Sequence, residues 1–248
     1  MDIKVGTYNI CHCGDYGNRK DGDPIWVTDI NIGATAETIK RLDFDIIGLN
    51  EVYFKGRNQD CFNQTEKLAS LSGYKFYASA EGASDGVTTI GNALLSKYPI
   101  LSVEKVKIPT IPKSEREEEG WYEERVLLVC DIEIDCKIYK VICTHFGCIL
   151  KERQLIVDAI CKIVDKDGAF VVMGDFNALP NDSELAPLYQ KMQSSASVMK
   201  NDDFTFASYD PQRTIDYIFV GSNAVVKDYC VHKEKTSDHF PVSAVLTV

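Results

Sequence analysis

The sequence contains no apolar run that approaches the roughly 18 to 20 residues needed to span a bilayer. Its start, MDIKVGTYNI, has an acidic second residue and lacks the apolar segment of a signal peptide, so we expect a soluble, cytoplasmic protein. Internal repeats, low-complexity tracts and a Pro/Gly/Ser-rich linker are also missing. Because 45% of the 248 residues are apolar, the chain can fill one sizeable core, and we expect residues 1–248 to form a single, monomeric domain.

Positive charge is in short supply. Lys and Arg number 27 against 37 Asp and Glu, which gives a formal net charge of −10. A protein that neutralises many phosphates through its own side chains normally has the opposite balance. Either nucleic acid is not the main partner, or something other than side chains supplies the positive charge. The acidic run EREEEGWYEE at 115–124 is interpreted as a solvated loop or as a rim that repels polyanions.

The nine cysteines lack the even count and short spacings of a disulfide framework, so we expect reduced thiols. Cys11-His12-Cys13 suggests a zinc site, but no second ligand pair follows at zinc spacing. Structural or incidental thiols are therefore the favoured interpretation.

Short apolar segments of strand length recur along the chain, rich in β-branched and aromatic residues and bounded by Gly, Asp, Asn or Pro. We expect strands at 3–10, 44–52, 91–96, 125–134, 137–146, 169–177, 215–221 and 241–248. Apolar residues at helical spacing predict helices over 29–42 and 150–165, with shorter ones at 63–72 and 183–193. Many strands with interspersed helices indicate an α/β or α+β protein.

Polar side chains gather where these strands begin or end, which is where functional groups concentrate on a rigid sheet. They are Asn9, Glu51, His145, Asp175, Asn177, Asp216, Asp238 and His239. Four carboxylates meeting at one edge would repel one another, and a hard divalent cation between them would relieve that repulsion.

Two pairs within this set predict hydrolytic chemistry. Asp175 and Asn177 would project to the same side if the strand continued through both, so that Asp175 could accept a proton from water while Asn177 held a phosphoryl oxygen. A simple turn after the strand is the alternative for this pair. His239 follows Asp238, and Asp216 opens the preceding strand, where its carboxylate could orient the imidazole.

A series of short blocks carries a family resemblance. The blocks are TYNI with Asn9, LNEV with Glu51, GNALLSKYPI with Asn92, ERVLLV with Arg125, THFG with His145, GDFNALP with Asp175 and Asn177, TIDYIFV with Asp216, and SDHFPV with Asp238 and His239. In this order the chain from Asn9 to Val248 resembles the endonuclease/exonuclease/phosphatase superfamily, the deoxyribonuclease I-like phosphoesterases.

The resemblance implies a four-layered α/β sandwich, in which two mixed β-sheets lie face to face, helices lie outside, and the active site lies at one end. It also implies hydrolysis of a phosphoester with Mg²⁺ or Mn²⁺ as cofactor. Glu51 resembles the main metal ligand, assisted by Asn9 and Asp238. Asp175 resembles the residue that orients or deprotonates the attacking water, with Asn177 on a phosphate oxygen.

The remaining roles implied by the resemblance concern charge and substrate. His239, paired with Asp216, resembles the imidazole that stabilises the charge developing on the phosphoryl group. His145 resembles the second histidine, near the leaving-group oxygen. Arg125 and Asn92 are expected to contact substrate.

Departures from the family pattern bear on the substrate. Asn50 stands where many relatives have Gln, and His145 differs from the Tyr of many abasic-site endonucleases. A His at this position resembles the deoxyribonuclease I, sphingomyelinase and sugar- or nucleotide-cleaving branches. The acidic charge favours a small or lipid-like phosphoester, and a phosphodiester in particular, over nucleic acid. A deoxyribonuclease I-like endonuclease and a non-catalytic binding module on the same fold remain the alternatives.

Overall fold

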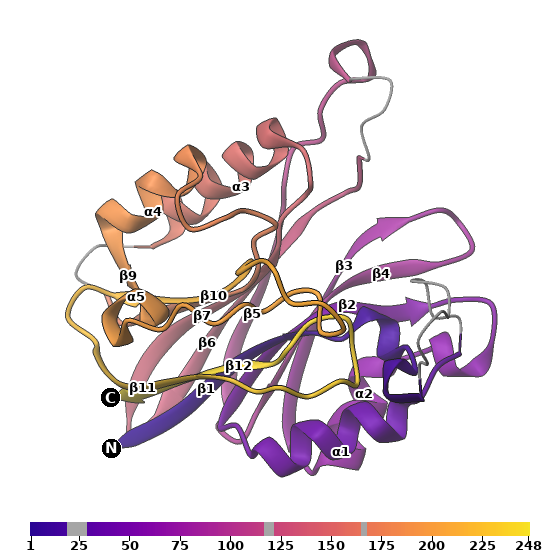
Figure 1. The fold of residues 1–248 in the computed structure, drawn as a ribbon, viewed down its shortest axis with the longest axis horizontal. Helices are drawn as coiled ribbons and strands as arrows, with labels where there is room; N and C mark the ends of the chain where they lie inside the picture. Colours follow the sequence, from indigo (N-terminus) through magenta and orange to yellow (C-terminus); the bar gives the residue numbers. More distant parts are fainter. Residues whose placement is uncertain (19–28, 117–121, 165–167) are drawn as a thin grey trace.

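Two six-stranded β-sheets pack face to face, and helices cover their outer faces (Figure 1). The computed structural model describes residues 1–18, 29–116, 122–164 and 168–248. The first sheet has the strand order β11-β12-β1-β2-β4-β3 and the second β5-β6-β7-β8-β10-β9. Both sheets are mixed, because β1 runs parallel to β2 and β7 parallel to β8 while the other neighbours are antiparallel.

The elements are bounded as follows. The strands are β1 (Asp2–Asn9), β2 (Ile46–Lys55), β3 (Phe76–Ser84), β4 (Thr89–Ser96), β5 (Ile100–Lys107), β6 (Val126–Ile134), β7 (Lys137–His145), β8 (Phe170–Asp175), β9 (Met192–Ser194), β10 (Asp216–Gly221), β11 (Val225–Val231) and β12 (Val242–Thr247). The α-helices are α1 (Ile32–Leu42), α2 (Gln64–Ser72), α3 (Leu150–Ile163), α4 (Ala186–Lys191) and α5 (Ser195–Met199).

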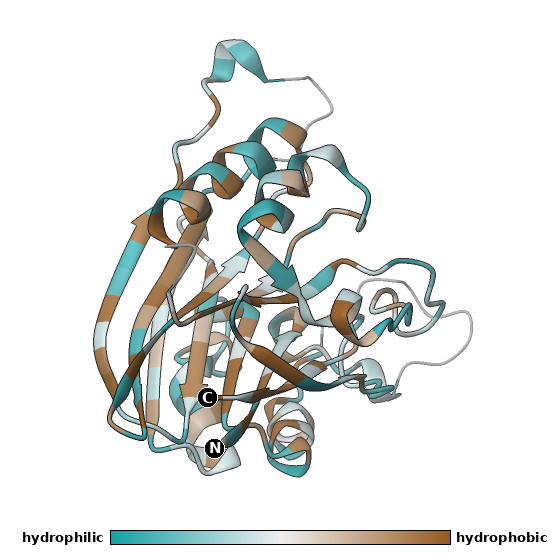
Figure 2. Ribbon diagram, turned by 90° about the vertical axis from the view of Figure 1, so that its left-hand side faces the viewer, coloured by the Kyte–Doolittle hydropathy of each residue, from teal (hydrophilic) through white to brown (hydrophobic). Residues whose placement is uncertain are grey.

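Three apolar clusters hold the layers together. The central cluster lies between the sheets and includes Val5 of β1 and Leu128 of β6. Ile39 of α1 packs on the outer face of the first sheet, and Ile156 of α3 packs on that of the second. Figure 2 shows the strands largely brown and the helices alternating between brown and teal, as expected when only one helix face is buried. The predicted four-layered α/β sandwich is confirmed.

The two parallel strand pairs position the polar strand ends. In the first sheet Asn9 at the end of β1 is in register with Asn50 of β2, and in the second His145 at the end of β7 is in register with Asp175 of β8. The antiparallel neighbour β10 places Asp216 opposite Asp175. Because the sheets face each other, these strand ends meet at one end of the sandwich.

The eight predicted strands and four predicted helices are all present, with ends shifted by a few residues. β3, β5, β9, β11 and α5 were not predicted. β5 and β11 lie at sheet edges: β5 is mostly exposed and only two of the seven residues of β11 are buried, so both lack the continuous apolar runs that mark interior strands. Residues 117–121 of the acidic segment and residue 165 of the predicted helix lie outside the described residues. No helix in the described ranges is long and apolar enough to cross a membrane.

Candidate active site

Gly174 sets the geometry of Asp175 at the end of β8. Its φ of 152° is unfavourable for other residues, and a Cβ here would collide with the backbone oxygen of Thr144 in β7. The close approach of the two strands brings Asp175 beside His145 of β7 and Asp216 of β10. Asp175 is only 2% exposed, so its carboxylate lies inside the end of the sandwich.

Asp216 and His239 form a tight pair. His239 Nδ1 lies 2.9 Å and 3.1 Å from the two carboxylate oxygens of Asp216, and both side chains are buried. This contact fixes the ring, and the opposite nitrogen, Nε2, lies 3.6 Å from Asp175 Oδ2. The structure thus brings together Asp216 and His239, the two residues that the sequence analysis paired.

The charges of this group are set by burial and by one another. Burial lowers the pKa of His239, but the carboxylates of Asp216 and Asp175 outweigh it and raise that pKa to about 10. Burial raises the pKa of Asp175 to about 7, with Asp216 adding to the effect and His239 opposing it. At neutral pH an imidazolium therefore lies between Asp216 and a carboxyl group that titrates near neutrality.

Asn9 links the two sheets at this point. Its Nδ2 donates to Glu51 Oε1 at 3.0 Å and to Asp175 Oδ2 at 3.1 Å, while its Oδ1 accepts from the Cys11 N–H at 3.1 Å. The amide thus presents nitrogen, not oxygen, to Glu51. In this arrangement Asn9 positions two carboxylates and does not offer the oxygen ligand expected from the resemblance.

Glu51 is a partly exposed carboxylate of the group. Its backbone is left-handed, with φ at 56°, where the register between β2 and β4 shifts, and its side chain is 24% exposed. Burial raises its pKa, but His12, His145 and Asn9 together lower it to about 2. Glu51 is therefore ionised throughout the physiological range.

Asp238 lies on the loop before β12. Its Oδ1 accepts from Ser237 Oγ at 3.1 Å, and the same hydroxyl lies 2.8 Å from the backbone oxygen of Asn9. Burial and the charge of Glu51 raise the pKa of Asp238, against the effect of His239. Asp238 thus belongs to the same acidic cluster as Glu51.

His145 faces this cluster from the second sheet. Its Nε2 lies 3.5 Å from Asp175 Oδ2 and 4.0 Å from Glu51 Oε1. Burial and the positive charge of Arg125 lower its pKa to about 3, so the ring is neutral at neutral pH. At neutral pH the carboxyl group of Asp175 therefore lies near two imidazoles, of which that of His145 is neutral and that of His239 is protonated.

Asn177 does not continue the strand, which corrects one expectation. Its φ is 44°, and its N–H donates to Asp175 Oδ1 at 2.9 Å, the geometry of a turn closed by an aspartate side chain. Its Nδ2 donates to the Phe146 oxygen at 3.0 Å and lies 3.3 Å from His145 Nε2. The amide still reaches the site, but through the turn and not through strand alternation.

Asn50 and Asn92 form a buried amide pair behind the site. Asn50 Nδ2 donates to Asn92 Oδ1 and to the Thr144 oxygen, both at 2.8 Å, and Asn50 Oδ1 accepts from the Asp175 N–H at 3.0 Å. Asn92 Nδ2 donates to the Val126 oxygen, and the residue is 2% exposed. Because both polar atoms of Asn92 are used within the protein, the expected substrate contact is replaced by a structural one.

Arg125 lies at the entry to β6, with a side chain 9% exposed. Its Nη2 forms a 2.9 Å ion pair with Glu123 Oε2, and its Nε is buried with no hydrogen-bond partner among the described residues. Its charge acts on His145. The structure therefore places Arg125 next to the site but already paired with a carboxylate.

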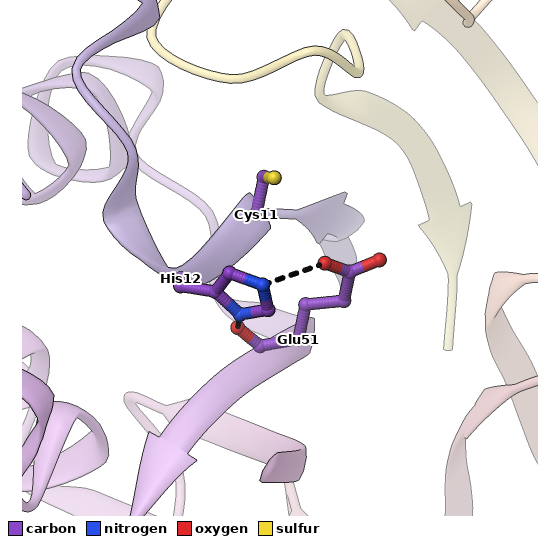
Figure 3. A group of neighbouring side chains, drawn as sticks. All are labelled: Cys11, His12 and Glu51. Atoms are coloured by element: carbon purple, nitrogen blue, oxygen red, sulfur yellow. Dashed lines mark hydrogen bonds and ion pairs between the residues drawn. The ribbon is translucent and has the colours of Figure 1, made fainter. Parts of the chain in front are cut away.

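Cys11 and His12 are neighbours of the site that the sequence did not single out for it. They follow Asn9 after one intervening residue, Ile10, and Figure 3 shows the His12 ring directed at Glu51. His12 Nε2 lies 3.4 Å from Glu51 Oε2, whereas Cys13 is buried in the apolar cluster beneath α1. Within the Cys-His-Cys motif, Cys11 and His12 therefore lie close to Glu51, whereas the Cys13 thiol lies in the apolar cluster.

Two groups among the described residues bring ligand atoms close enough to hold a metal ion: Asp175 with Asp216 and His239, and Cys11 with His12 and Glu51. Both Asp216 oxygens face His239 Nδ1, and Asp216 is fully buried. The first group therefore has little free coordination capacity. The carboxylate of Glu51 is partly exposed, with a side chain 24% accessible.

A sequence model of the Endonuclease/Exonuclease/phosphatase family matches residues 6–239. An endonuclease/exonuclease/phosphatase from Beutenbergia cavernae DSM 12333 superposes with a TM-score of 0.81 at 21% identity, covering 100% of this chain and 72% of that one. A mannosyl-6-phosphatase of Bacteroides thetaiotaomicron VPI-5482 gives 0.73 at 17% identity, covering 99% and 100% of the two chains.

Truncated TDP2 of Caenorhabditis elegans gives a TM-score of 0.70 at 16% identity, covering 100% of this chain and 98% of that one. A search of curated protein sequences finds no significant match. The structural likenesses show the deoxyribonuclease I-like fold, and the sequence match extends over nearly the whole chain. The chain belongs to the endonuclease/exonuclease/phosphatase family, whose members are hydrolases acting on phosphoester bonds.

Proposed function

We propose that the protein hydrolyses a phosphoester with a divalent metal ion and an activated water, and that its substrate is a small or lipid-like phosphodiester. The observation that carries the proposal is the convergence on Asp175 Oδ2. Asn9 Nδ2, His145 Nε2 and His239 Nε2 lie 3.1, 3.5 and 3.6 Å from this one oxygen. Three nitrogens aimed at one buried carboxylate make a site for proton transfer.

Asp175 is the proposed general base. Burial raises its pKa to about 7, which places its proton affinity near that of a base working at neutral pH. The carboxylate accepts a proton from the attacking water, and the hydrogen bond from Asn9 orients it.

His239 is the proposed source of positive charge at the phosphoryl group. Asp216 holds its Nδ1 and keeps the ring protonated, so that Nε2–H is a charged donor at neutral pH. Donors fixed in advance at the oxygens where charge develops stabilise a phosphoryl transition state without reorganisation.

His145 and Asn177 complete the proposed phosphate-binding surface. Asn177 Nδ2, on the turn after β8, and His145 Nε2, at the end of β7, are 3.3 Å apart, so both can face one phosphate. Since His145 is neutral at neutral pH, it acts as a hydrogen-bond donor toward the leaving oxygen and not as a second cation. Arg125 adds positive charge near His145.

The acidic cluster fits a hard cation, because Glu51 is ionised and accessible and Asp238 adds a second carboxylate. Glu51 and Asp238 would hold Mg²⁺ or Mn²⁺, with Asn9 positioning Glu51. When bound, the ion supplies positive charge to the phosphoryl oxygens.

A small substrate is favoured by the net charge of −10, because a polyanion would be repelled outside the immediate site. The likeness to a mannosyl-6-phosphatase supports a small phosphoester substrate without specifying one. Monoester or diester preference is the first property to measure.

A substrate panel tests the proposal. The purified protein is incubated with p-nitrophenyl phosphate, bis(p-nitrophenyl) phosphate, a choline phospholipid, RNA and supercoiled DNA, each with Mg²⁺, with Mn²⁺ and with EDTA. We expect metal-dependent release of nitrophenol or of the lipid headgroup, abolished by EDTA. Robust nicking of DNA would favour the deoxyribonuclease I-like alternative, and inactivity on every substrate would favour a binding module.

A further inference from the structure

Cys11, His12 and Glu51 form a cluster beside the site that the proposed reaction does not use as a whole. Their ligand atoms, one thiol sulfur, one imidazole nitrogen and one carboxylate oxygen, all lie within 4.8 Å of one another. Figure 3 shows the His12 ring between the two other residues, directed at Glu51. A mixed sulfur, nitrogen and oxygen set suits a borderline-soft cation such as Zn²⁺ and not Mg²⁺, which prefers oxygen alone.

Contacts with Tyr53 and Gln64 hold His12 in place. The ring stacks on Tyr53 with centroids 4.3 Å apart and an interplanar angle of 12°. Gln64 fixes both partners, since its Nε2 donates to the His12 oxygen at 2.8 Å and its Oε1 accepts from the Tyr53 N–H at 2.9 Å. The imidazole is therefore presented to Glu51 by contacts on its own backbone and on its face.

One ring nitrogen of His12 contacts the backbone of Glu51, and the other faces the Glu51 carboxylate. Its Nδ1 lies 3.2 Å from the backbone oxygen of Glu51, which can only accept, so Nδ1 carries the proton. The other ring nitrogen, Nε2, lies 3.4 Å from Glu51 Oε2: the two form an ion pair when the ring is protonated, and a metal ion that replaces the proton would bind the Nε2 lone pair and the carboxylate together. A separation of roughly 3.3 Å is what two ligands of a tetrahedral zinc ion show, given Zn–N and Zn–O bonds of about 2.0 to 2.1 Å.

We propose that Cys11 Sγ, His12 Nε2 and Glu51 Oε2 form a zinc site with water as the fourth ligand, distinct in its ligand set from the oxygen site of the reaction. On binding, the Cys11 thiol releases its proton to solvent and its sulfur bonds to the metal. The hydroxyl of Tyr16, 3.4 Å from Cys11 Sγ, can donate to the resulting thiolate.

The consequence rests on the proposed function. Because Glu51 belongs to both sites, Zn²⁺ held by Cys11 and His12 removes a ligand from the activating ion. Zinc would then inhibit hydrolysis competitively with Mg²⁺, so the rate of hydrolysis would fall as the zinc concentration rises.

Direct binding tests the site without any substrate. Metal-free protein is titrated with Co²⁺, whose absorbance shows a thiolate-to-metal charge-transfer band only when sulfur is a ligand, and Zn²⁺ is then added to displace it. We expect one equivalent to bind with that band and Zn²⁺ to abolish it. No charge-transfer band in the wild type would overturn the inference.

Variants identify the ligands. Cys11→Ser should remove the band, and His12→Gln should weaken binding at least about tenfold. Cys13→Ser is the matched control, because Cys13 is in the same motif but lies in the core, and it should bind as the wild type does. A Cys11→Ser protein that keeps the band would refute the assignment, and the partly exposed His12 variant tests it should Cys11→Ser fold poorly.

Inhibition of hydrolysis by Zn²⁺ distinguishes a failure of the zinc-site proposal from a failure of the proposed function. If the wild type hydrolyses bis(p-nitrophenyl) phosphate, Zn²⁺ at fixed Mg²⁺ should inhibit it, and His12→Gln should be at least about tenfold less sensitive. Equal sensitivity would refute the shared-ligand consequence. If no activity is found, the Co²⁺ titration still decides whether the zinc site exists.

Discussion

Asp175 is the residue on which both sheets converge, and its substitution is the sharpest test at the residue scale. Asp175→Asn keeps the size of the side chain but removes the base, and His239→Ala removes the charged donor. Each should lower kcat by about a thousandfold or more, since general-base and electrostatic contributions are each worth about 10² to 10⁴.

Thermal melting of the same variants provides the control. Asp175→Asn keeps the size of the side chain, so we expect its melting temperature within a few degrees of the wild type. His239→Ala leaves the buried Asp216 carboxylate without its partner, so we expect this variant to melt at a lower temperature but still cooperatively. Near-normal turnover in a folded Asp175→Asn protein would contradict the assigned role.

The pH dependence follows from the same two groups. Asp175 accepts a proton only when ionised, and its pKa is raised to about 7, so kcat/KM should rise with pH up to neutrality. His239 donates only when protonated, and its pKa is raised to about 10, so activity should fall as pH rises through that value. Rates measured from pH 5 to pH 11 should give a bell, and His239→Ala should lose the alkaline limb.

The positions and contacts of the site residues could be predicted from the sequence to different degrees. Asp216 and His239 could be paired from the sequence, because both flank predicted strands. Asn177 reached the site by a turn that strand alternation did not foresee. Asn92 was taken for a substrate contact, because a sequence does not show whether a polar residue inside a strand meets solvent or another buried amide.

At the scale of elements, Gly174 and Gly33 allow a matched comparison. Gly174→Ala should lower the free energy of unfolding by about 2 to 4 kcal/mol, because its φ is unfavourable and the new Cβ meets the Thr144 oxygen. Gly33→Ala lies near the start of α1, where the new Cβ would meet only Asn31 Oδ1 at an ordinary contact distance of 3.6 Å, and should raise that free energy by up to about 1 kcal/mol. Urea unfolding measures both, and equal effects would contradict the strand-packing account.

Which elements were foreseen depended on burial. Interior strands such as β8, buried at every position, gave continuous apolar runs. The edge strand β5 is mostly exposed and has mixed polarity, so its pairing with β6 was not readable from its own residues. The helices α1 and α3 have one apolar stripe each, which is the pattern that sequence detects best.

At the scale of the whole molecule, the net charge of −10 and the phosphoester chemistry of the family are compatible only if positive charge is local. Protonated His239 supplies part of this positive charge, and a cation held by the carboxylates of Glu51 and Asp238 would supply the rest. The polar residues at the predicted strand ends, together with the family resemblance, indicated where the site would lie, whereas the two parallel strand pairs that bring these ends together came from the structure. The amide orientation of Asn9 and the approach of His12 required the structure.

The Mg²⁺ dependence of hydrolysis tests the central claim most directly. Initial rates on bis(p-nitrophenyl) phosphate are measured against Mg²⁺ concentration for EDTA-treated wild type and for Glu51→Gln. We predict no rate without metal, full recovery with Mg²⁺ in the wild type, and a half-saturating Mg²⁺ concentration at least about tenfold higher in the variant. A metal-free wild type that hydrolyses at the full rate, or a Glu51→Gln protein with unchanged Mg²⁺ dependence, would contradict it.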